Sequence, residues 1–394
     1  MLRALLLSLG LVAVSPSLDE VAPAADDLVC NQEPGNRFFW VERAFCDLEL
    51  AGPGLARGIV IWNHGISGTA EQWRAPAPLA FRLLQARGWD VIAIKRHNLA
   101  ETAVDRSLYR AVERTLEEVR RQRARGYRRV VLAGQSFGGY ITLDAAEQSS
   151  DLFAVIAMAP GVRSSGADGR LDPSITERSL MRVKTERVAL VLPKDDALFG
   201  FMVRGERANR ILSARPLSYL LIDELSGISG HGGAMGGRFA LRYGSCLDDF
   251  LSTPTLPAGR FVCPPIDESS VIRQLLLPDP RTVRFLEDPS AAPPRLGYLV
   301  GRWYALLDDT LILFGMVDGP SPARVWFQWT TVQSGGGRYD AQIADTRISF
   351  TLPEGARVVV EPGSGDPLLT WTSADGKRVT HATLIEMKGA RSAR

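Results

Sequence analysis

The chain has 394 residues, with 46 Lys and Arg against 44 Asp and Glu, and a formal net charge of +2 at pH 7. That length has room for two domains, and so small a net charge gives no reason to expect a nucleic acid or an anionic membrane as a partner. The chain holds only four histidines and four cysteines, so each can be weighed as a candidate catalytic or bridging residue.

The N-terminus has the pattern of an export signal. Residues 1–3 (Met-Leu-Arg) are followed by an apolar run over 4–14, which is too short to span a bilayer. Small residues at Ala22 and Ala24 predict cleavage after Ala24, so residues 1–24 are expected to be a signal peptide. We expect the mature protein to be periplasmic or secreted, with no stable membrane anchor after cleavage, because no later segment reaches about 18 uninterrupted apolar residues.

Apolar runs of strand length alternate with helix-like segments in the first part of the chain. An amphipathic stretch over 107–125, with apolar side chains at helical spacing, predicts a helix that covers a sheet. This alternation predicts an α/β fold with a mostly parallel sheet and a site at the carboxyl edge of its strands. The apolar runs start near residues 58, 91, 130, 152, 188 and 217.

The strand starting at residue 130 leads directly into Gly134-Gln-Ser136-Phe-Gly138, and a helix-like segment follows. Such a strand–turn–helix context is what a nucleophile elbow requires. The tight turn holds the serine in a strained backbone conformation, and a Cβ at either flanking glycine would collide with neighbouring elements. The motif therefore predicts Ser136 as a nucleophile.

The partners that a serine nucleophile requires follow other predicted strands. The turn after the strand at 58 carries His64 and Gly65, and the backbone amide of Ile66 in that turn is a predicted oxyanion donor. The amide of Phe137, directly after the serine, is the second predicted donor. Later strands lead into Pro193-Lys-Asp-Asp196 and into the Gly-rich loop that contains His231.

With its acid and base in the order Ser, Asp, His, the chain resembles the α/β-hydrolase family over roughly residues 55 to 250. The resemblance implies a mostly parallel central sheet, with Ser136 as nucleophile, His231 as general base and an acid after the penultimate strand. We expect Asp196 to be that acid, because the family usually places it three residues after a turn-forming residue, here Pro193. The adjacent Asp195 is the alternative.

The remaining histidines fit other positions. His64 is expected to brace the oxyanion turn, His97 ends a strand, and His381 lies in the C-terminal part of the chain. No metal or organic cofactor is implied, and the cysteines lack the C-x-x-C spacing or neighbouring histidines of a zinc site. In an exported chain, we instead expect two disulfides between cysteines close in sequence, Cys30–Cys46 and Cys246–Cys263.

A second domain is predicted after the hydrolase domain, which we place at 25–275. Prolines punctuate residues 276–295, which suits a linker. Short β-type runs at 325–329, 348–352 and 358–360, with Gly-rich turns expected at 335–337 and 363–366, predict a small antiparallel sheet or barrel over 296–390. Gly301-Arg302-Trp303 resembles the opening of lipocalin-like barrels. Chemistry is expected to survive deletion from about Arg295 onward.

The sequence as a whole predicts an exported serine hydrolase, most simply a carboxylesterase with a Ser-His-Asp triad, acting on a small-molecule ester or short peptide. The stretch 134–140 also resembles the elbow of prolyl-oligopeptidase-like enzymes, so a serine peptidase is an alternative. A non-catalytic binding protein that uses the C-terminal β module is the other alternative.

Overall fold

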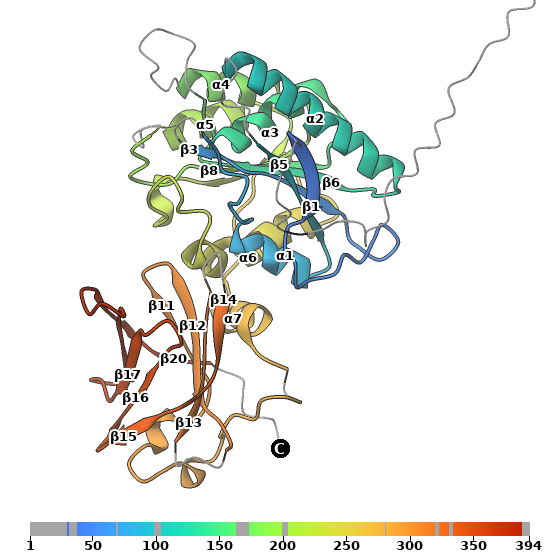
Figure 1. Cartoon of the computed structure of the whole chain (residues 1–394). Coiled ribbons are helices and arrows are strands. Elements are labelled where there is room, and N and C mark those ends of the chain that lie inside the picture. Colours follow the sequence, from blue (N-terminus) through green and yellow to red (C-terminus); the bar gives the residue numbers. More distant parts are fainter. Residues whose placement is uncertain are drawn as a thin grey trace, which may run out of the picture.

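The computed structural model describes residues 30, 38–67, 70–97, 104–162, 173–198, 204–279, 281–319, 323–330 and 334–387. The predicted signal peptide, residues 1–24, lies outside them. None of the helices among the described residues is long and apolar enough to cross a membrane. Figure 1 shows an α/β body followed by a β body, with the chain passing once from one to the other.

The α/β body is built on an eight-stranded sheet with the strand order β1-β5-β2-β6-β7-β8-β9-β10. Only β1 runs antiparallel to its neighbour, so the predicted mostly parallel sheet is confirmed. The strands β2 and β5–β9 are buried along their whole length, as expected for parallel strands covered on both faces. The strands are β1 (Phe39–Arg43), β2 (Ile59–Asn63), β5 (Asp90–Arg96), β6 (Val130–Gln135), β7 (Ala154–Met158), β8 (Arg187–Val191), β9 (Ser218–Ile222) and β10 (Gly259–Arg260).

Helices cover both faces of this sheet. Alternate strand residues point to opposite faces, so Val60 and Trp62 join one apolar cluster while Ile59 and Ile61 join the other. The first cluster contains α1 (Leu79–Ala86), α6 (Gly237–Ser252) and α7 (Glu268–Leu276). The second contains α2 (Val104–Ala124), α3 (Phe137–Gln148), α4 (Pro173–Arg182) and α5 (Arg204–Ser213).

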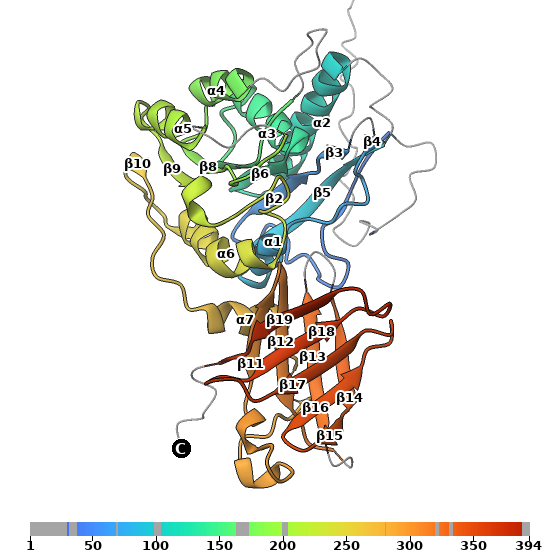
Figure 2. The ribbon, with the colours of Figure 1, turned by 90° about the vertical axis from the view of Figure 1, so that its left-hand side faces the viewer.

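The β body consists of two five-stranded antiparallel sheets that face each other across an apolar core (Figure 2). Consecutive strands pair within each sheet, and the last strand, β20, returns to pair with β11. One sheet holds β11 (Trp303–Leu307), β12 (Thr310–Met316), β13 (Arg324–Thr330), β14 (Ser334–Asp340) and β20 (Ile385–Glu386). The other holds β15 (Gln342–Ala344), β16 (Arg347–Thr351), β17 (Arg357–Glu361), β18 (Leu368–Thr372) and β19 (Val379–Thr383).

The turn predicted at residues 335–337 is wrong, because these glycines lie within β14 and pair with β13. The reason is the large aromatic side chain opposite them. A Cβ on Gly335 would lie 2.6 Å from an atom of the Trp329 ring, and one on Gly336 would lie 2.3 Å from the Phe327 carbonyl oxygen. Gly335 and Gly336 make room for β13 rather than reversing the chain. Trp303, of the predicted barrel opening, is buried in the core of the β body.

The two bodies share one apolar cluster. Tyr304, Leu311 and Leu313 of the β body are buried in the same cluster as Phe239 of α6. Helix α7 contacts β12 and β13, and the Tyr304 hydroxyl donates to Glu268 Oε2 at 2.9 Å. The predicted linker over residues 276–295 is partly paired with the β body, since the Leu286 amide donates to the Met316 carbonyl oxygen and the Asp318 amide to that of Arg284.

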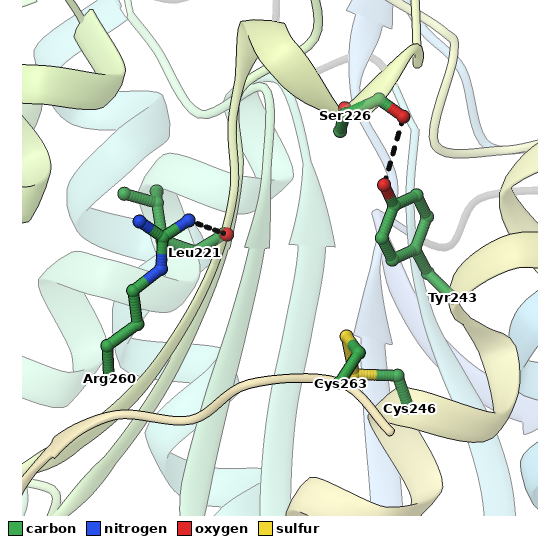
Figure 3. Close-up of a disulfide and its surroundings, with 6 residues drawn as sticks. All are labelled: Leu221, Ser226, Tyr243, Cys246, Arg260 and Cys263. Carbon is green, nitrogen blue, oxygen red and sulfur yellow. Dashed lines mark hydrogen bonds between the residues drawn. A yellow bond between two sulfur atoms is a disulfide. The ribbon is translucent and has the colours of Figure 1, made fainter. Parts of the chain in front are cut away.

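The structure contains the predicted disulfide Cys246–Cys263, which joins α6 to the segment after β10 (Figure 3). It does not join Cys30 to Cys46. The Cys30 thiol instead donates to the Arg43 carbonyl oxygen at 3.2 Å and makes a hydrogen bond with Cys46. Burial and that neighbouring thiol raise the pKa of Cys30 to about 12. Closeness in sequence did bring these two side chains together, but as hydrogen-bonded thiols rather than as a covalent pair.

Candidate active site

Ser136 lies in the turn between β6 and α3 with φ 56° and ψ −121°. Left-handed values of φ are costly for a residue with a side chain, and they persist only where the surroundings enforce them. A Cβ on Gly134 would lie 2.1 Å from the Gly138 carbonyl oxygen, and one on Gly138 would lie 2.1 Å from that of Asn63. The two glycines therefore let β6, the turn and the end of β2 approach closely enough to hold this conformation.

The backbone of Ser136 is fixed on both sides. Its amide donates to the Met158 carbonyl oxygen of β7 at 2.9 Å, and its own carbonyl accepts from the amides of Tyr140 and Gly161. The residue is 6% exposed. The strained serine is thus anchored to the end of β7, to the loop that follows it and to the first turn of α3.

His231 faces a buried carboxylate. Its Nδ1 atom lies 3.1 Å from both side-chain oxygens of Asp196, whose side chain is fully buried, whereas the imidazole is 20% exposed. The neighbouring Asp195 points elsewhere, and it accepts a hydrogen bond from the Ser229 hydroxyl at 3.1 Å. The geometry therefore separates the two candidate acids, because Asp196 pairs with the histidine and Asp195 braces its loop.

The acid turn and the histidine loop are joined backbone to backbone. The Lys194 amide donates to the Ile228 carbonyl oxygen at 2.8 Å, and the Gly230 amide donates to the Lys194 carbonyl oxygen at 2.6 Å. These bonds lie just before Asp196 and His231 on their respective loops. The distance between the carboxylate and the imidazole is thus set by backbone hydrogen bonds as well as by the side chains.

Gln135, the residue before the serine, connects three parts of the site. Its side-chain amide donates to the His231 carbonyl oxygen at 3.1 Å. On the other side, a Cβ on Gly65 would lie 2.8 Å from Gln135 Oε1 and 3.2 Å from Ser136 Cβ. The Gly65 turn, the serine and the histidine loop therefore meet here. Sequence reasoning missed Gln135, although its position inside the elbow motif was the available signal.

The two predicted oxyanion donors lie at the start of α3 and in a short hairpin. Phe137 is the first residue of α3, so its amide has no partner within that helix. The Gln72 amide donates to the Gly65 carbonyl oxygen, which makes this a hydrogen-bonded pair of the short hairpin β3 (Ile66–Ser67) and β4 (Ala70–Glu71). The next pair, Ile66 with Glu71, is then a non-hydrogen-bonded pair, in which the Ile66 amide points away from β4.

His64 is buried beneath the oxyanion turn. Its Nε2 atom accepts from the Arg96 amide at 3.0 Å, its Nδ1 atom lies 2.8 Å from the Gly65 carbonyl oxygen, and the Arg96 guanidinium donates to the His64 carbonyl oxygen. Burial, together with the Arg96 charge, holds the pKa of His64 well below its usual range. His64 is therefore a neutral residue that holds the turn in place. Of the other histidines, His97 lies edge-on to Trp73, and His381 is on β19 in the β body.

A buried arginine accompanies the acid. Arg204, at the start of α5, has its Nη1 atom 3.9 Å from Asp196 Oδ2, and its Nη2 atom donates to the Pro160 carbonyl oxygen at 2.9 Å. Burial lowers the pKa of Arg204, and the Asp196 charge opposes that shift. The carboxylate thus lies between an imidazole and a guanidinium. No motif in the sequence pointed to Arg204.

Among the described residues, no group of His, Cys, Asp and Glu side chains could hold a metal ion. The site offers instead a strained serine, an imidazole oriented by a carboxylate, and backbone amides. Such a set can activate a hydroxyl for attack on a carbonyl and stabilise the resulting negative charge.

Residues 59–218 match the model of the alpha/beta hydrolase family, and the first domain has the α/β-hydrolase fold. No curated protein matches the chain. Among solved structures it is similar to an esterase from Pyrococcus furiosus (14% identity, 57% of this chain and 97% of that chain, TM-score 0.40). It is also similar to a puromycin-hydrolyzing peptidase from Mycobacterium tuberculosis (16% identity, 57% of this chain and 39% of that chain, TM-score 0.40). A third similar structure is a predicted CIB-like hydrolase from Thermoplasma acidophilum (19% identity, 55% of this chain and 92% of that chain, TM-score 0.36).

Proposed function

We propose that this α/β hydrolase is a serine hydrolase that cleaves carboxylic esters, with Ser136 as nucleophile, His231 as general base and Asp196 as the acid. One observation carries the proposal. A serine held in the strained turn of a strand–turn–helix motif is accompanied, at the same sheet edge, by a histidine whose Nδ1 atom faces a buried carboxylate. A serine hydroxyl is a weak nucleophile unless such a base takes its proton.

The reaction proceeds through an acyl-enzyme. Ser136 Oγ attacks the ester carbonyl carbon as its proton passes to His231 Nε2. The carbon–oxygen bond to the alcohol then breaks, and the imidazolium returns that proton to the departing alcohol. Water attacks the acyl-enzyme with the same histidine as base, which releases the carboxylic acid and restores Ser136. Asp196 holds the imidazole tautomer and stabilises the imidazolium at each stage.

The amides of Ile66 and Phe137 are proposed to bind the oxyanion. Negative charge on the former carbonyl oxygen exists only in the tetrahedral states, so donors directed at it lower the barrier without tightening substrate binding. Loss of one such donor typically costs a factor of about 10²–10³ in rate.

An ester is the favoured substrate because an alcohol leaves more readily than an amine, which must be protonated first. A peptidase remains the alternative on the strength of the 134–140 stretch. A binding protein without catalysis is disfavoured, because a decayed site would be expected to lose at least one of Ser136, Asp196 and His231.

The test is covalent labelling with a fluorophosphonate probe, followed by peptide mapping. We expect wild-type protein to be labelled at Ser136, with no labelling of Ser136→Ala and much slower labelling of His231→Ala. p-Nitrophenyl esters of graded chain length, assayed beside aminoacyl-nitroanilides, then separate esterase from peptidase. Folded wild-type protein that the probe fails to label would exclude the serine-hydrolase proposal.

Export to an oxidising compartment is part of the proposal. It is supported by the signal pattern over residues 1–24 and by the Cys246–Cys263 disulfide, since such bridges persist mainly outside the cytosol. N-terminal sequencing of protein recovered from the periplasm or medium should begin near Ala25. An N-terminus that begins at Met1 would contradict export by cleavage.

A further inference from the structure

Helix α6 begins immediately after the His231 loop, and a residue from the β body caps it. The N-cap position is Gly236, which has no side chain to cap the helix itself. The Gly237 amide donates to the Asp309 carbonyl oxygen at 2.9 Å, and the Arg238 amide donates to Asp309 Oδ1 at 2.8 Å. Two of the backbone amides that a helix start leaves without partners are therefore satisfied by Asp309.

The start of α6 is shaped to receive this carboxylate. A Cβ on Gly236 would lie 1.6 Å from Asp309 Oδ2, and one on Gly237 would lie 2.7 Å from the Asp309 carbonyl oxygen. Any side chain at these two positions would displace Asp309. A carboxylate is also the group that the positive end of a helix dipole favours.

Asp309 is itself held in a tight hairpin between β11 and β12. Its neighbour Asp308 has φ 53°, a left-handed value that is costly for a residue with a side chain, and the Asp308 carbonyl oxygen accepts from Arg238 Nη2 at 2.9 Å. Leu311, two residues beyond Asp309, is fully buried in the cluster shared with α6. The hairpin is thus a fixed part of the contact. The figures place β11 and β12 beneath α6.

The segment between the cap and His231 is short and hydrogen-bonded throughout. The Gly233 amide donates to the Gly230 carbonyl oxygen and the Met235 amide to that of Gly232, each at 2.9 Å, while the Leu79 amide donates to the Met235 carbonyl oxygen at 3.0 Å. Because these are consecutive tight turns, we expect a displacement of the first turn of α6 to displace His231 as well.

We propose that Asp309 is a positioning residue for His231, and that the β body is therefore part of the catalytic unit. By capping α6, Asp309 holds the loop over residues 230–236 so that the imidazole faces Asp196 and Ser136. This inference rests on the proposed role of His231 as the general base. Asp309 acts only through that loop and is not itself a catalytic residue.

The test compares three variants of the full chain with wild type. Asp309→Ala removes the cap, Asp309→Asn keeps an oxygen that accepts from the Arg238 amide, and Asp308→Asn is the control in the same hairpin, since Asn tolerates left-handed φ. For each we measure kcat and KM on a p-nitrophenyl ester, the rate of fluorophosphonate labelling at Ser136, and the thermal unfolding midpoint.

We expect Asp309→Ala to lower kcat and the labelling rate by about 10- to 100-fold, with KM changed less than about twofold, because small misplacements of a catalytic group carry costs of that size. Asp309→Asn should recover most of this loss, and Asp308→Asn should match wild type. A role in stability alone would lower the unfolding midpoint of Asp309→Ala while leaving kcat of the folded protein unchanged, and that result would overturn the proposal.

Two further comparisons keep the outcome decisive. Gly236→Ala displaces the same carboxylate without substituting Asp309, so it is the second variant to measure if Asp309→Ala does not fold. Wild-type kcat in folded Gly236→Ala would contradict the proposal. If wild-type protein is labelled at Ser136 but Asp309→Ala is labelled equally fast, the positioning role fails and the serine hydrolase stands. If wild-type protein is not labelled, the proposed function itself fails.

Discussion

Arg204 lies beside Asp196, with its Nη1 atom 3.9 Å from Asp196 Oδ2, and its side chain is only 8% exposed. The carboxylate that faces His231 thus also lies beside a guanidinium cation. In the low-dielectric interior such a neighbour changes how strongly the carboxylate can stabilise an imidazolium. The strength of the base is therefore expected to depend on a residue that does not contact the substrate.

Replacing Arg204 by Gln should move the acid limb of the kcat/KM profile to higher pH. The substitution removes a positive charge beside Asp196, and loss of a like charge favours the charged form of a nearby imidazole. A pH–rate profile on a p-nitrophenyl ester measures the shift. Arg207→Gln, on the same helix but exposed and paired with Glu177, is the control and should leave the profile in place.

The two adjacent aspartates should differ sharply in their effect on turnover. Asp196→Asn should lower kcat by about 10⁴-fold, because amidation of a triad aspartate favours the wrong imidazole tautomer. Asp195→Asn removes only a partner of the Ser229 hydroxyl and should cost less than about tenfold. Steady-state kinetics of the two variants decide the matter, and the opposite ranking would make Asp195 the acid.

His64 should make stability depend on pH below its ordinary pKa of 6.5. The folded protein holds this imidazole neutral, whereas the unfolded chain binds a proton as pH falls through 6.5, so acid favours unfolding. The resulting loss in the free energy of unfolding is at most about 1.4 kcal/mol for each pH unit below 6.5, and above pH 6.5 His64 causes no such loss.

The check is urea unfolding between pH 5 and 7.5 for wild type and His64→Gln, which keeps an acceptor for the Arg96 amide. The slope of unfolding free energy against pH should be shallower in the variant. Equal slopes would show that His64 is protonated to the same extent in the folded and unfolded states.

Removing the Cys246–Cys263 disulfide should destabilise the protein by about 3 kcal/mol, the chain-entropy value for a loop of this size. The bridge closes a sequence separation of 17 residues and fixes α6 to the segment after β10. Urea unfolding of the double serine variant measures the loss. Cys30→Ser, at a residue that the structure does not place in a disulfide, is the control and should change the unfolding free energy by less than about 1 kcal/mol.

Deleting the chain from about Arg295 should abolish activity, contrary to the expectation from sequence. The deletion would expose the apolar surface of α6 and α7 that Leu311 and Leu313 cover, and it would remove Asp309 from the start of α6. Fluorophosphonate labelling and light scattering of the truncated protein test this. A soluble fragment labelled as fast as the full chain would restore the independent-module view.

The α/β fold could be predicted from sequence because its signals are local. Buried parallel strands are largely apolar along their length, and the elbow places Ser136 and its flanking glycines, 134 and 138, within five consecutive residues. Ser136, the aspartate pair and His231 could also be identified from short stretches of sequence, because each follows its own predicted strand. The confirmed pairing of Cys246 with Cys263 followed from the same short-range view.

The tertiary structure shows which of two adjacent residues faces the candidate site, and which residues distant in sequence lie near it. Spacing from Pro193 favoured Asp196 but left Asp195 open, and in the fold only Asp196 faces His231, whereas Asp195 accepts from Ser229. Arg204 lies beside Asp196, and Asp309 contacts the start of α6, and each comes from a segment with no motif of its own. Their roles depend on burial and on hydrogen-bond geometry between distant segments, and a one-dimensional pattern records neither.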